Sequence, residues 1–129
     1  MIEVLRCGAF TSVQDLGRFG LRHLGVSQAG VLDPIATQQA NLLLGNESNA
    51  AVVELTVGPL QLAFHQDCSV VVTGVDFNTT ISTGKASAQQ QALLPGQPVA
   101  LKAGMQITLQ RPMIPGSRAY VAASMYRLF

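Results

Sequence analysis

Residues 51–74, AVVELTVGPLQLAFHQDCSVVVTG, decide the fold class of this chain. Two pairs of turn-type residues, Gly58-Pro59 and Gln66-Asp67, divide the stretch into three short runs rich in apolar and β-branched residues. In the middle run apolar side chains alternate with polar ones, which is the period of a strand with one buried face. The stretch therefore predicts three consecutive strands, over 51–57, 60–65 and 68–74.

The same pattern returns toward the C-terminus. Runs over 98–103, 105–110 and 118–124 predict three more strands, separated by Gly104 and by a Pro-Gly pair. The run SAQQQALLPGQ, residues 87–97, is polar and Gln-rich and predicts a loop. Strands spaced this closely around little helix indicate a mainly β fold, an antiparallel barrel or sandwich.

One helix is predicted, over residues 34–44, and both of its ends are marked. Asp33 is suited to the N-cap, Pro34 to the first helical position and Gly45 to a left-handed stop. The predicted apolar face consists of Ala36, Ala40, Leu43 and Leu44, while Thr37 and Asn41 lie on another face.

Composition limits the possible functions. The chain has 129 residues, enough for one domain, with 12% charged residues, 48% apolar residues and a net charge of +1. Such a charge gives no basis for binding nucleic acid or an anionic membrane. The N-terminus lacks a signal peptide and no apolar run approaches the ~20 residues of a membrane helix, so we expect a cytoplasmic protein. Cys7 and Cys68 are predicted to be reduced core residues.

Polar chemistry is concentrated in residues 11–34, which contain four glycines and no steady helical or strand period. The simpler interpretation is that the glycines form tight turns and that polar side chains such as Asp15 bond the backbone of the loop. The functional interpretation is that the loop approaches a ligand while Gln14, Arg18 and His23 orient its carbonyl or carboxylate groups.

Glu54 is a second candidate, because it stands among apolar residues in the middle of a predicted strand. There it either faces outward to solvent or lies in a cleft with a partner. Nucleotide-binding and hydrolase signatures are absent from the sequence. His65 and Cys68 have the spacing of metal ligands but lack a recognisable second pair, so no metal site is predicted.

Several motifs, taken as a set, resemble one family: IEVLRCG, TSVQDLGRFGLRHLGVSQAGVLDPIATQQANLLLGN, VVELTVGPLQLAF, VVTGVDF and GSRAYVA. This is the KipA-like family, also known as allophanate hydrolase subunit 2, as the C subunit of 5-oxoprolinase or as the biotin-dependent carboxyltransferase family. The resemblance runs from residue 1 to about residue 121. The residues that match its motifs are Gln14, Asp15, Arg18, Asp33, Asn41, Asn46 and Glu54.

The resemblance implies a cyclophilin-like antiparallel β-barrel with one short helix, and a partner, the KipI-like subunit (the B subunit of 5-oxoprolinase, or allophanate hydrolase subunit 1). It implies one component of a 5-oxoprolinase or urea carboxylase complex that acts on an amide substrate. ATP or biotin would then lie on partner subunits, and no cofactor is predicted on this chain. The predicted substrate-binding residues are Gln14, Asp15, Arg18, His23 and Glu54.

The chain departs from the family pattern in two places. Ala29 stands where relatives often have serine, so no hydroxyl chemistry is predicted there. Relatives continue beyond the segment that corresponds to AYVAASMYRLF, so residues 1–129 are expected to be one domain, the N-terminal portion of a longer architecture, inactive alone. An exposed strand edge would favour a homo-oligomer. The alternatives are a regulatory protein that binds a KipI-like partner without chemistry, and a decayed reading frame whose fold survives without function.

Overall fold

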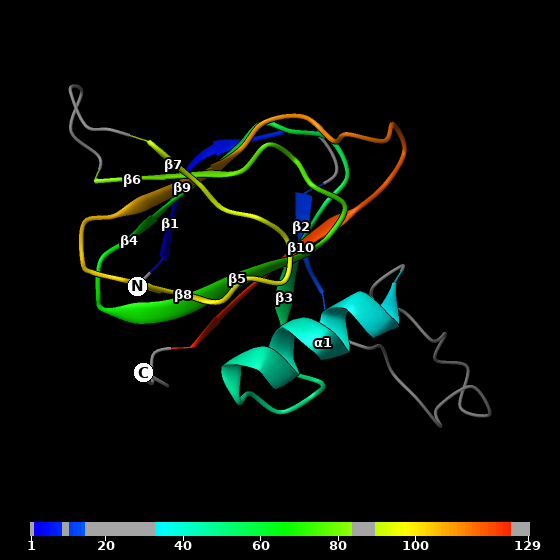
Figure 1. Cartoon of the computed structure of the whole chain (residues 1–129), viewed down its shortest axis with the longest axis horizontal. Coiled ribbons are helices and arrows are strands. Elements are labelled where there is room, and N and C mark those ends of the chain that lie inside the picture. The colour runs from blue at the N-terminus through cyan, green and yellow to red at the C-terminus, as the bar shows by residue number, and fades with distance from the viewer. Residues whose placement is uncertain (1, 9–10, 15–32, 84–89, 125–129) are drawn as a thin grey trace.

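The structure is a computed structural model that describes residues 2–8, 11–14, 33–83 and 90–124, which form ten strands and one helix (Figure 1). The helix α1 spans Pro34–Leu44. The strands are β1 Ile2–Cys7, β2 Thr11–Gln14, β3 Val52–Leu55, β4 Leu60–Phe64, β5 Cys68–Gly74, β6 Thr80–Ser82, β7 Gln91–Ala92, β8 Val99–Leu101, β9 Gln106–Leu109 and β10 Ala119–Ser124. The predicted mainly β fold with one short helix is confirmed.

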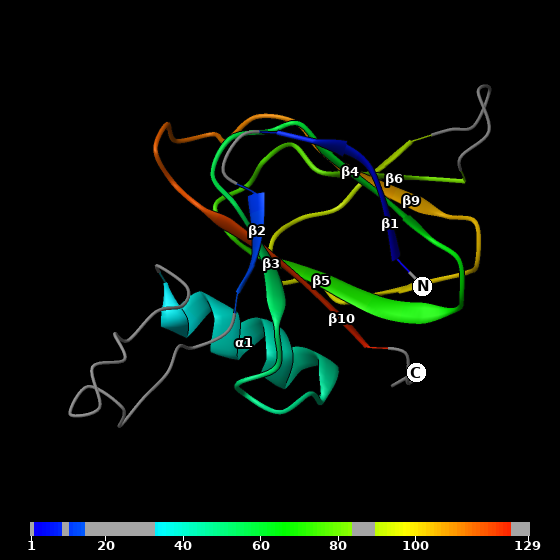
Figure 2. The same ribbon diagram turned by 180° about the vertical axis from the view of Figure 1, so that it is seen from behind.

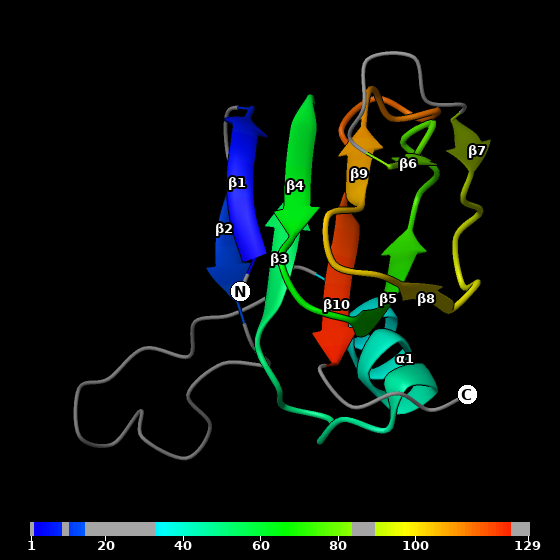
Figure 3. The same ribbon diagram turned by 90° about the vertical axis from the view of Figure 1, so that its left-hand side faces the viewer.

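The strands form two five-stranded sheets that lie face to face. The first sheet has the order β1-β4-β9-β6-β7 and the second the order β2-β3-β10-β5-β8. Every pairing between the described strands is antiparallel. The helix α1 covers the outer face of the second sheet, beside β5 and β10 (Figures 2 and 3).

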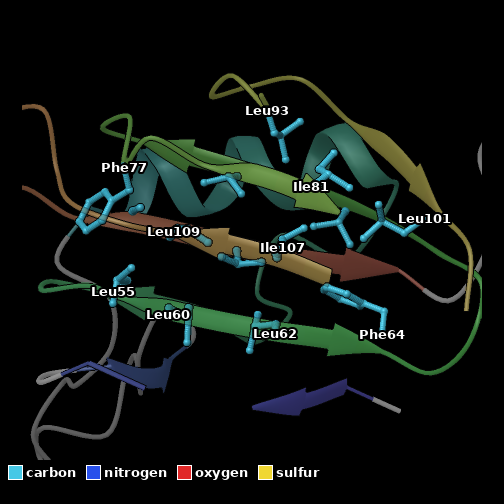
Figure 4. Packing of buried hydrophobic residues seen from close by; sticks show 14 of the residues in the cluster. Leu55, Leu60, Leu62, Phe64, Phe77, Ile81, Leu93, Leu101, Ile107 and Leu109 are labelled. Atoms are coloured by element: carbon cyan, nitrogen blue, oxygen red, sulfur yellow. The ribbon is translucent and has the colours of Figure 1, made fainter. Parts of the chain in front are cut away.

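The main core lies between the two sheets. It is built from alternate residues of the strands, because successive side chains of a strand point to opposite faces. Leu60, Leu62 and Phe64 of β4 enter it from the first sheet, and Leu55 and Leu101 enter from the second (Figure 4). The alternation seen in the sequence of residues 60–65 therefore corresponds to one buried face and one outward face.

The helix begins and ends where the sequence predicts. The Asp33 carboxylate accepts a hydrogen bond from the Ala36 backbone N–H at 3.1 Å, and Gly45 ends the helix with φ 73°. The predicted apolar face is only partly correct, because Leu43 is 40% exposed whereas Thr37 and Asn41 are fully buried. The two polar side chains tolerate burial because each has hydrogen-bond partners.

The six predicted strands are present, each within its predicted range or at its bounds. Four further strands were missed: β1, β2, β6 and β7. β6 and β7 have three and two residues, too few to show a period. β7 contradicts the predicted loop over 87–97, and β2 contradicts the absence of strand character at the start of 11–34.

Cys68 is buried as predicted, but Cys7 is exposed, so its assignment to the core is wrong. It lies on β1, an edge strand that pairs with β4 alone and whose residues are all exposed. Within the described ranges, the 11-residue helix is too short to cross a bilayer.

Candidate functional site

A row of polar side chains crosses the second sheet from β2 to β5. The strand register places Ser12 opposite Glu54, Glu54 opposite Tyr120, and Tyr120 opposite Thr73. Residues directly opposite in neighbouring antiparallel strands lie on the same face of the sheet. This is the outer face, because Tyr120 packs in the cluster that contains Ala40 of the helix. The β5 and β10 end of the row therefore lies beneath α1, and the β3 and β2 end lies on the part of the sheet beyond the helix.

Tyr120 connects the strands of this row to the start of the helix. Its side chain is fully buried and its hydroxyl donates to Glu54 Oε2 at 2.8 Å. The same hydroxyl accepts from the Asp33 backbone N–H at 2.9 Å. Burial, followed by the hydrogen bond to Glu54, raises the pKa of Tyr120 well above its usual range. Tyr120 is therefore a neutral donor that fixes one oxygen of the Glu54 carboxylate.

Glu54 lines a cleft of about 470 Å³, the strand cleft, together with Ser12, Thr56 and Arg118. Leu55 pairs with Ala119, and Thr56 and Arg118 are the next residues beyond this pair on the two chain segments. The described residues that line the strand cleft thus carry one carboxylate, one guanidinium and two hydroxyl groups. A site with both donors and acceptors close together suits a small ligand that itself has both, such as an amide.

A second cleft of about 540 Å³, the helix cleft, lies between the start of α1 and the ends of β5 and β10. Its walls include Asp33, Gln39 and Ser117, and it shares Arg118 with the strand cleft. Gly74 also lines it with φ 90°, and a Cβ at this position would collide with the carbonyl of Arg118. Arg118 is therefore the residue that the two clefts share.

The guanidinium group of Arg118 is only partly hydrogen-bonded. Its Nη1 donates to the Gly116 carbonyl at 2.9 Å. Its Nε is buried and has no hydrogen-bond partner within the described part of the chain. A guanidinium carries donors only, so Arg118 can bind an anionic partner through donors that are not already paired.

The sequence-predicted site residues are only partly placed by the structure. Glu54 lies on the outward face of its strand, as one interpretation predicted. It also lines a cleft and has Tyr120 as a partner, as the other predicted. Gln14 is the last residue of β2, and its backbone pairs with Val52. Asp15, Arg18 and His23 lie outside the described residues.

Sequence reasoning missed Tyr120 and Arg118 as site residues. The signal was a polar side chain at every second position, Glu54 and Thr56 in one run and Arg118 and Tyr120 in another. Each pair indicates a polar face, but the sequence gives no reason to place those two faces side by side. That placement depends on the pairing of β3 with β10.

Two other family-matched residues support the fold at the opposite end of α1. The fully buried Asn41 donates to the Ala50 carbonyl at 2.9 Å, and its Oδ1 accepts from Asn46 Nδ2 at 3.3 Å. Asn46 also donates to the Ala123 carbonyl at 3.1 Å. The pair therefore fastens the loop after the helix to β10.

The two residues with metal-ligand spacing, His65 and Cys68, have other surroundings. His65 lies 2.8 Å from a carboxylate oxygen of Glu3, in an exposed pair. Cys68 is buried in the core, and this burial raises the pKa of its thiol. In the part of the chain that the structure describes, no three His, Cys, Asp or Glu side chains gather closely enough to hold a metal ion.

Comparison with known proteins adds sequence and structural relatives. The chain is 38% identical over 96% of its length to the C subunit of 5-oxoprolinase from Escherichia coli, and covers 37% of that protein. It is 29% identical over 93% of its length to urea amidolyase of Saccharomyces cerevisiae, and covers 6% of it. The solved structure of Kluyveromyces lactis urea carboxylase matches 95% of this chain with a TM-score of 0.79 and 32% identity, over 10% of that chain.

The chain thus spans little more than a third of the length of the bacterial relative. The family model described as "Carboxyltransferase domain, subdomain A and B" matches residues 24–125. This match covers most of the sequence and agrees with both the sequence relatives and the shared fold. The protein therefore belongs to the carboxyltransferase domain family, subdomain A and B.

Proposed function

We propose that this chain is one component of a 5-oxoprolinase or urea carboxylase type complex, and that its strand cleft contributes to the binding of an amide substrate. The observation that carries this proposal is the Glu54 carboxylate, held by Tyr120 in a cleft that also contains Arg118. The relatives support the substrate class, because their names refer to 5-oxoproline and to urea. Both molecules present a planar amide-type group.

The chemistry of the strand cleft matches such a group at both ends. An amide offers N–H donors and a carbonyl acceptor. The Glu54 carboxylate can accept from the N–H, while the Arg118 guanidinium and the hydroxyls of Ser12 and Thr56 can donate to oxygen atoms. Because Tyr120 orients the carboxylate before the ligand arrives, little of that order has to be created on binding.

The segment that follows β2 in the sequence is proposed to complete this site. Ser12 of β2 lines the strand cleft, and Gln14 is two residues further along the same strand. Asp15, Arg18 and His23 follow in the sequence and carry the donors and acceptors expected of substrate ligands. We include these four residues with Glu54 as the proposed substrate-binding set.

We further propose that activity requires other polypeptides. The Escherichia coli relative is by name one subunit of an enzyme, and this chain covers 37% of its length. The proposed partner is a KipI-like subunit, and ATP or biotin would be bound there and not by this chain. Preorganised groups from more than one chain would then have to be assembled before catalysis can begin.

The test is turnover in a reconstituted complex. The 129-residue chain is co-expressed with a KipI-like subunit and with the other subunits of the assembly. Complex formation is followed by size exclusion with light scattering, which also reports self-association. ATP-dependent opening of 5-oxoproline and carboxylation of urea are then assayed separately.

The decisive variant is Glu54→Gln, compared with Glu47→Gln as a control. Gln at position 54 keeps the acceptor for Tyr120, so the fold is preserved while the charge is lost. Removing one preorganised electrostatic group from an active site lowers kcat by about 100- to 1000-fold in well-studied enzymes. We expect a loss of that order for Glu54→Gln and none for Glu47→Gln, because Glu47 is exposed and lines neither of the two clefts.

The outcomes separate the candidate functions. If the complex with Glu54→Gln turns over substrate as fast as the wild type does, the strand cleft is not part of the substrate site. A stable complex that turns over neither substrate would contradict the enzymatic proposal and favour the regulatory alternative, in which the chain binds a KipI-like partner without chemistry.

A further inference from the structure

We propose that Arg118 is a carboxylate anchor in the strand cleft, and that it selects ligands that carry a carboxylate beside their amide, such as 5-oxoproline, over urea. This inference rests on the proposed function of the strand cleft. It adds a specificity-determining residue that lies outside the substrate-binding set predicted from the sequence.

The position of Arg118 relative to Glu54 supports this role. Arg118 and Tyr120 lie two residues apart along β10 and its N-terminal extension, and therefore point to the same face. Glu54 is opposite Tyr120, so Arg118 and Glu54 are diagonal neighbours on that face. Diagonal neighbours in a sheet are about 7–8 Å apart, which brings both side chains within reach of one small ligand.

The donors of Arg118 are in a state that a carboxylate would complete. Nη1 is occupied by the Gly116 carbonyl, which fixes one arm of the guanidinium. The buried Nε has no partner within the described residues. The guanidinium is therefore incompletely paired, and its planar fork of donors matches the two oxygens of a carboxylate.

No described carboxylate already neutralises this guanidinium. In the described ranges the structure contains one ion pair, between Glu3 on the first sheet and His65 in the loop that follows β4. The Glu54 carboxylate instead accepts from the Tyr120 hydroxyl. Among the described residues, no ion pair neutralises the positive charge of Arg118 where it lines the two clefts.

The backbone of Arg118 is also held in place. Its carbonyl accepts from the Val75 backbone N–H at 3.0 Å. Gly74 permits this close approach, because a Cβ at that position would collide with the same carbonyl. A fixed backbone lowers the entropy lost when the side chain binds a ligand.

The two kinds of substrate differ in the group that Arg118 would bind. 5-Oxoproline carries a carboxylate on the carbon next to its lactam N–H, so one end can reach Arg118 while the N–H reaches Glu54. Urea has no carboxylate and offers Arg118 only a neutral carbonyl oxygen. A guanidinium that lacks an anionic partner discriminates against such a ligand.

The experiment removes the carboxylate from the ligand and the guanidinium from the protein in turn. Calorimetric titrations of the reconstituted complex measure the Kd of 5-oxoproline and of 2-pyrrolidinone, the same lactam without the carboxylate. The variants are Arg118→Met, Arg118→Lys and the control Arg111→Met. Arg111 is exposed, and it is its backbone carbonyl, not its side chain, that accepts a hydrogen bond from Asn78.

We expect Arg118→Met to raise the Kd of 5-oxoproline by about 10- to 100-fold, as is usual when a charged hydrogen bond to a ligand is lost. The Kd of 2-pyrrolidinone should not change. Arg118→Lys keeps the charge but not the planar fork of donors. Its Kd for 5-oxoproline should therefore lie between that of the wild type and that of Arg118→Met. Arg111→Met should bind both ligands as the wild type does.

Each other result overturns the inference in a recognisable way. Equal weakening of both ligands by Arg118→Met would make Arg118 a general wall of the cleft, and an unchanged Kd for 5-oxoproline would remove it from the site. If Arg118→Met does not fold, the comparison is made on Arg118→Lys, where equal behaviour toward the two lactams rejects the anchor. A wild-type complex that turns over urea but does not bind 5-oxoproline rejects the anchor and leaves the proposed function standing, whereas inactivity toward both substrates rejects both.

Discussion

Tyr120 is the residue at which three segments of the chain meet. It lies on β10, donates to Glu54 of β3 and accepts from the Asp33 backbone at the start of the helix. A buried hydroxyl must find such partners, because an unpaired polar group in the interior is costly. The same contacts that satisfy Tyr120 orient the carboxylate in the strand cleft, so stability and the proposed site depend on one side chain.

This arrangement predicts an alkaline loss of stability that depends on Tyr120. Its pKa in the folded protein lies above the ordinary tyrosine value of about 10, so the unfolded chain releases this proton first as the pH rises. The contribution of Tyr120 to the free energy of unfolding is therefore complete below about pH 10 and falls as the pH rises toward the folded-state pKa. Urea denaturation across this range should show that decline in the wild type.

Tyr120→Phe provides the comparison. It should lower the free energy of unfolding at neutral pH by about 1–3 kcal/mol, because Glu54 and the Asp33 N–H lose a partner. Above about pH 10 the difference from the wild type should shrink, since phenylalanine has no proton to lose. A difference that stays constant with pH would show that Tyr120 is not the group responsible.

At the scale of elements, the helix α1 is fixed to the second sheet at both of its ends. Its start is held by Tyr120, and Thr73 of β5 donates to the Ala36 carbonyl at 2.7 Å. Its end is held through Asn41 and Asn46, which connect the following loop to β10. The position of the helix cleft therefore depends on contacts at both ends of an 11-residue helix.

Replacing Asn41 by alanine should destabilise the protein by about 1–3 kcal/mol, because the Ala50 carbonyl and Asn46 lose a buried partner. Gln38→Ala on the exposed side of the same helix should change stability by no more than about 0.5 kcal/mol. Thermal and urea unfolding of both variants measure the effect. Equal stability of the two variants would mean that the loop after the helix is not fastened by Asn41.

At the scale of the whole molecule, the fold is held by burial between the two sheets. Among the residues that the structure describes, the main core contains 15 buried residues drawn from both sheets and from the segments that connect their strands. Burial of apolar surface is the dominant favourable contribution to folding, and protein interiors are in general packed too closely to tolerate cavities. The helix adds a second, smaller cluster on the outer face of one sheet.

Leu109→Ala should therefore lower the free energy of unfolding by about 2–5 kcal/mol, as is usual for a fully buried leucine. Leu42→Ala is the matched control, because Leu42 is 78% exposed and should change stability by less than about 0.5 kcal/mol. Urea denaturation of both variants gives the comparison. A small effect of Leu109→Ala would contradict a core shared between the sheets.

The sequence by itself determined the features that depend on neighbouring residues. Asp33, Pro34 and Gly45 set the helix bounds through local hydrogen bonds and dihedral angles. The strands from 51 to 74 follow from alternation and turn residues that can be recognised within a few positions. Family membership was also evident from the sequence motifs, because the order of several short segments is specific as a set.

The tertiary structure alone decided which residues share a site. Glu54 and Tyr120 are 66 positions apart, and their contact exists because β3 pairs with β10 in one particular register. A shift of that register by one residue would turn the two side chains to opposite faces. Such pairing results from burial summed over whole sheets, and no local pattern encodes it. The sequence could therefore predict Glu54 as a candidate site residue, but the fold was needed to place it beside Tyr120 and Arg118.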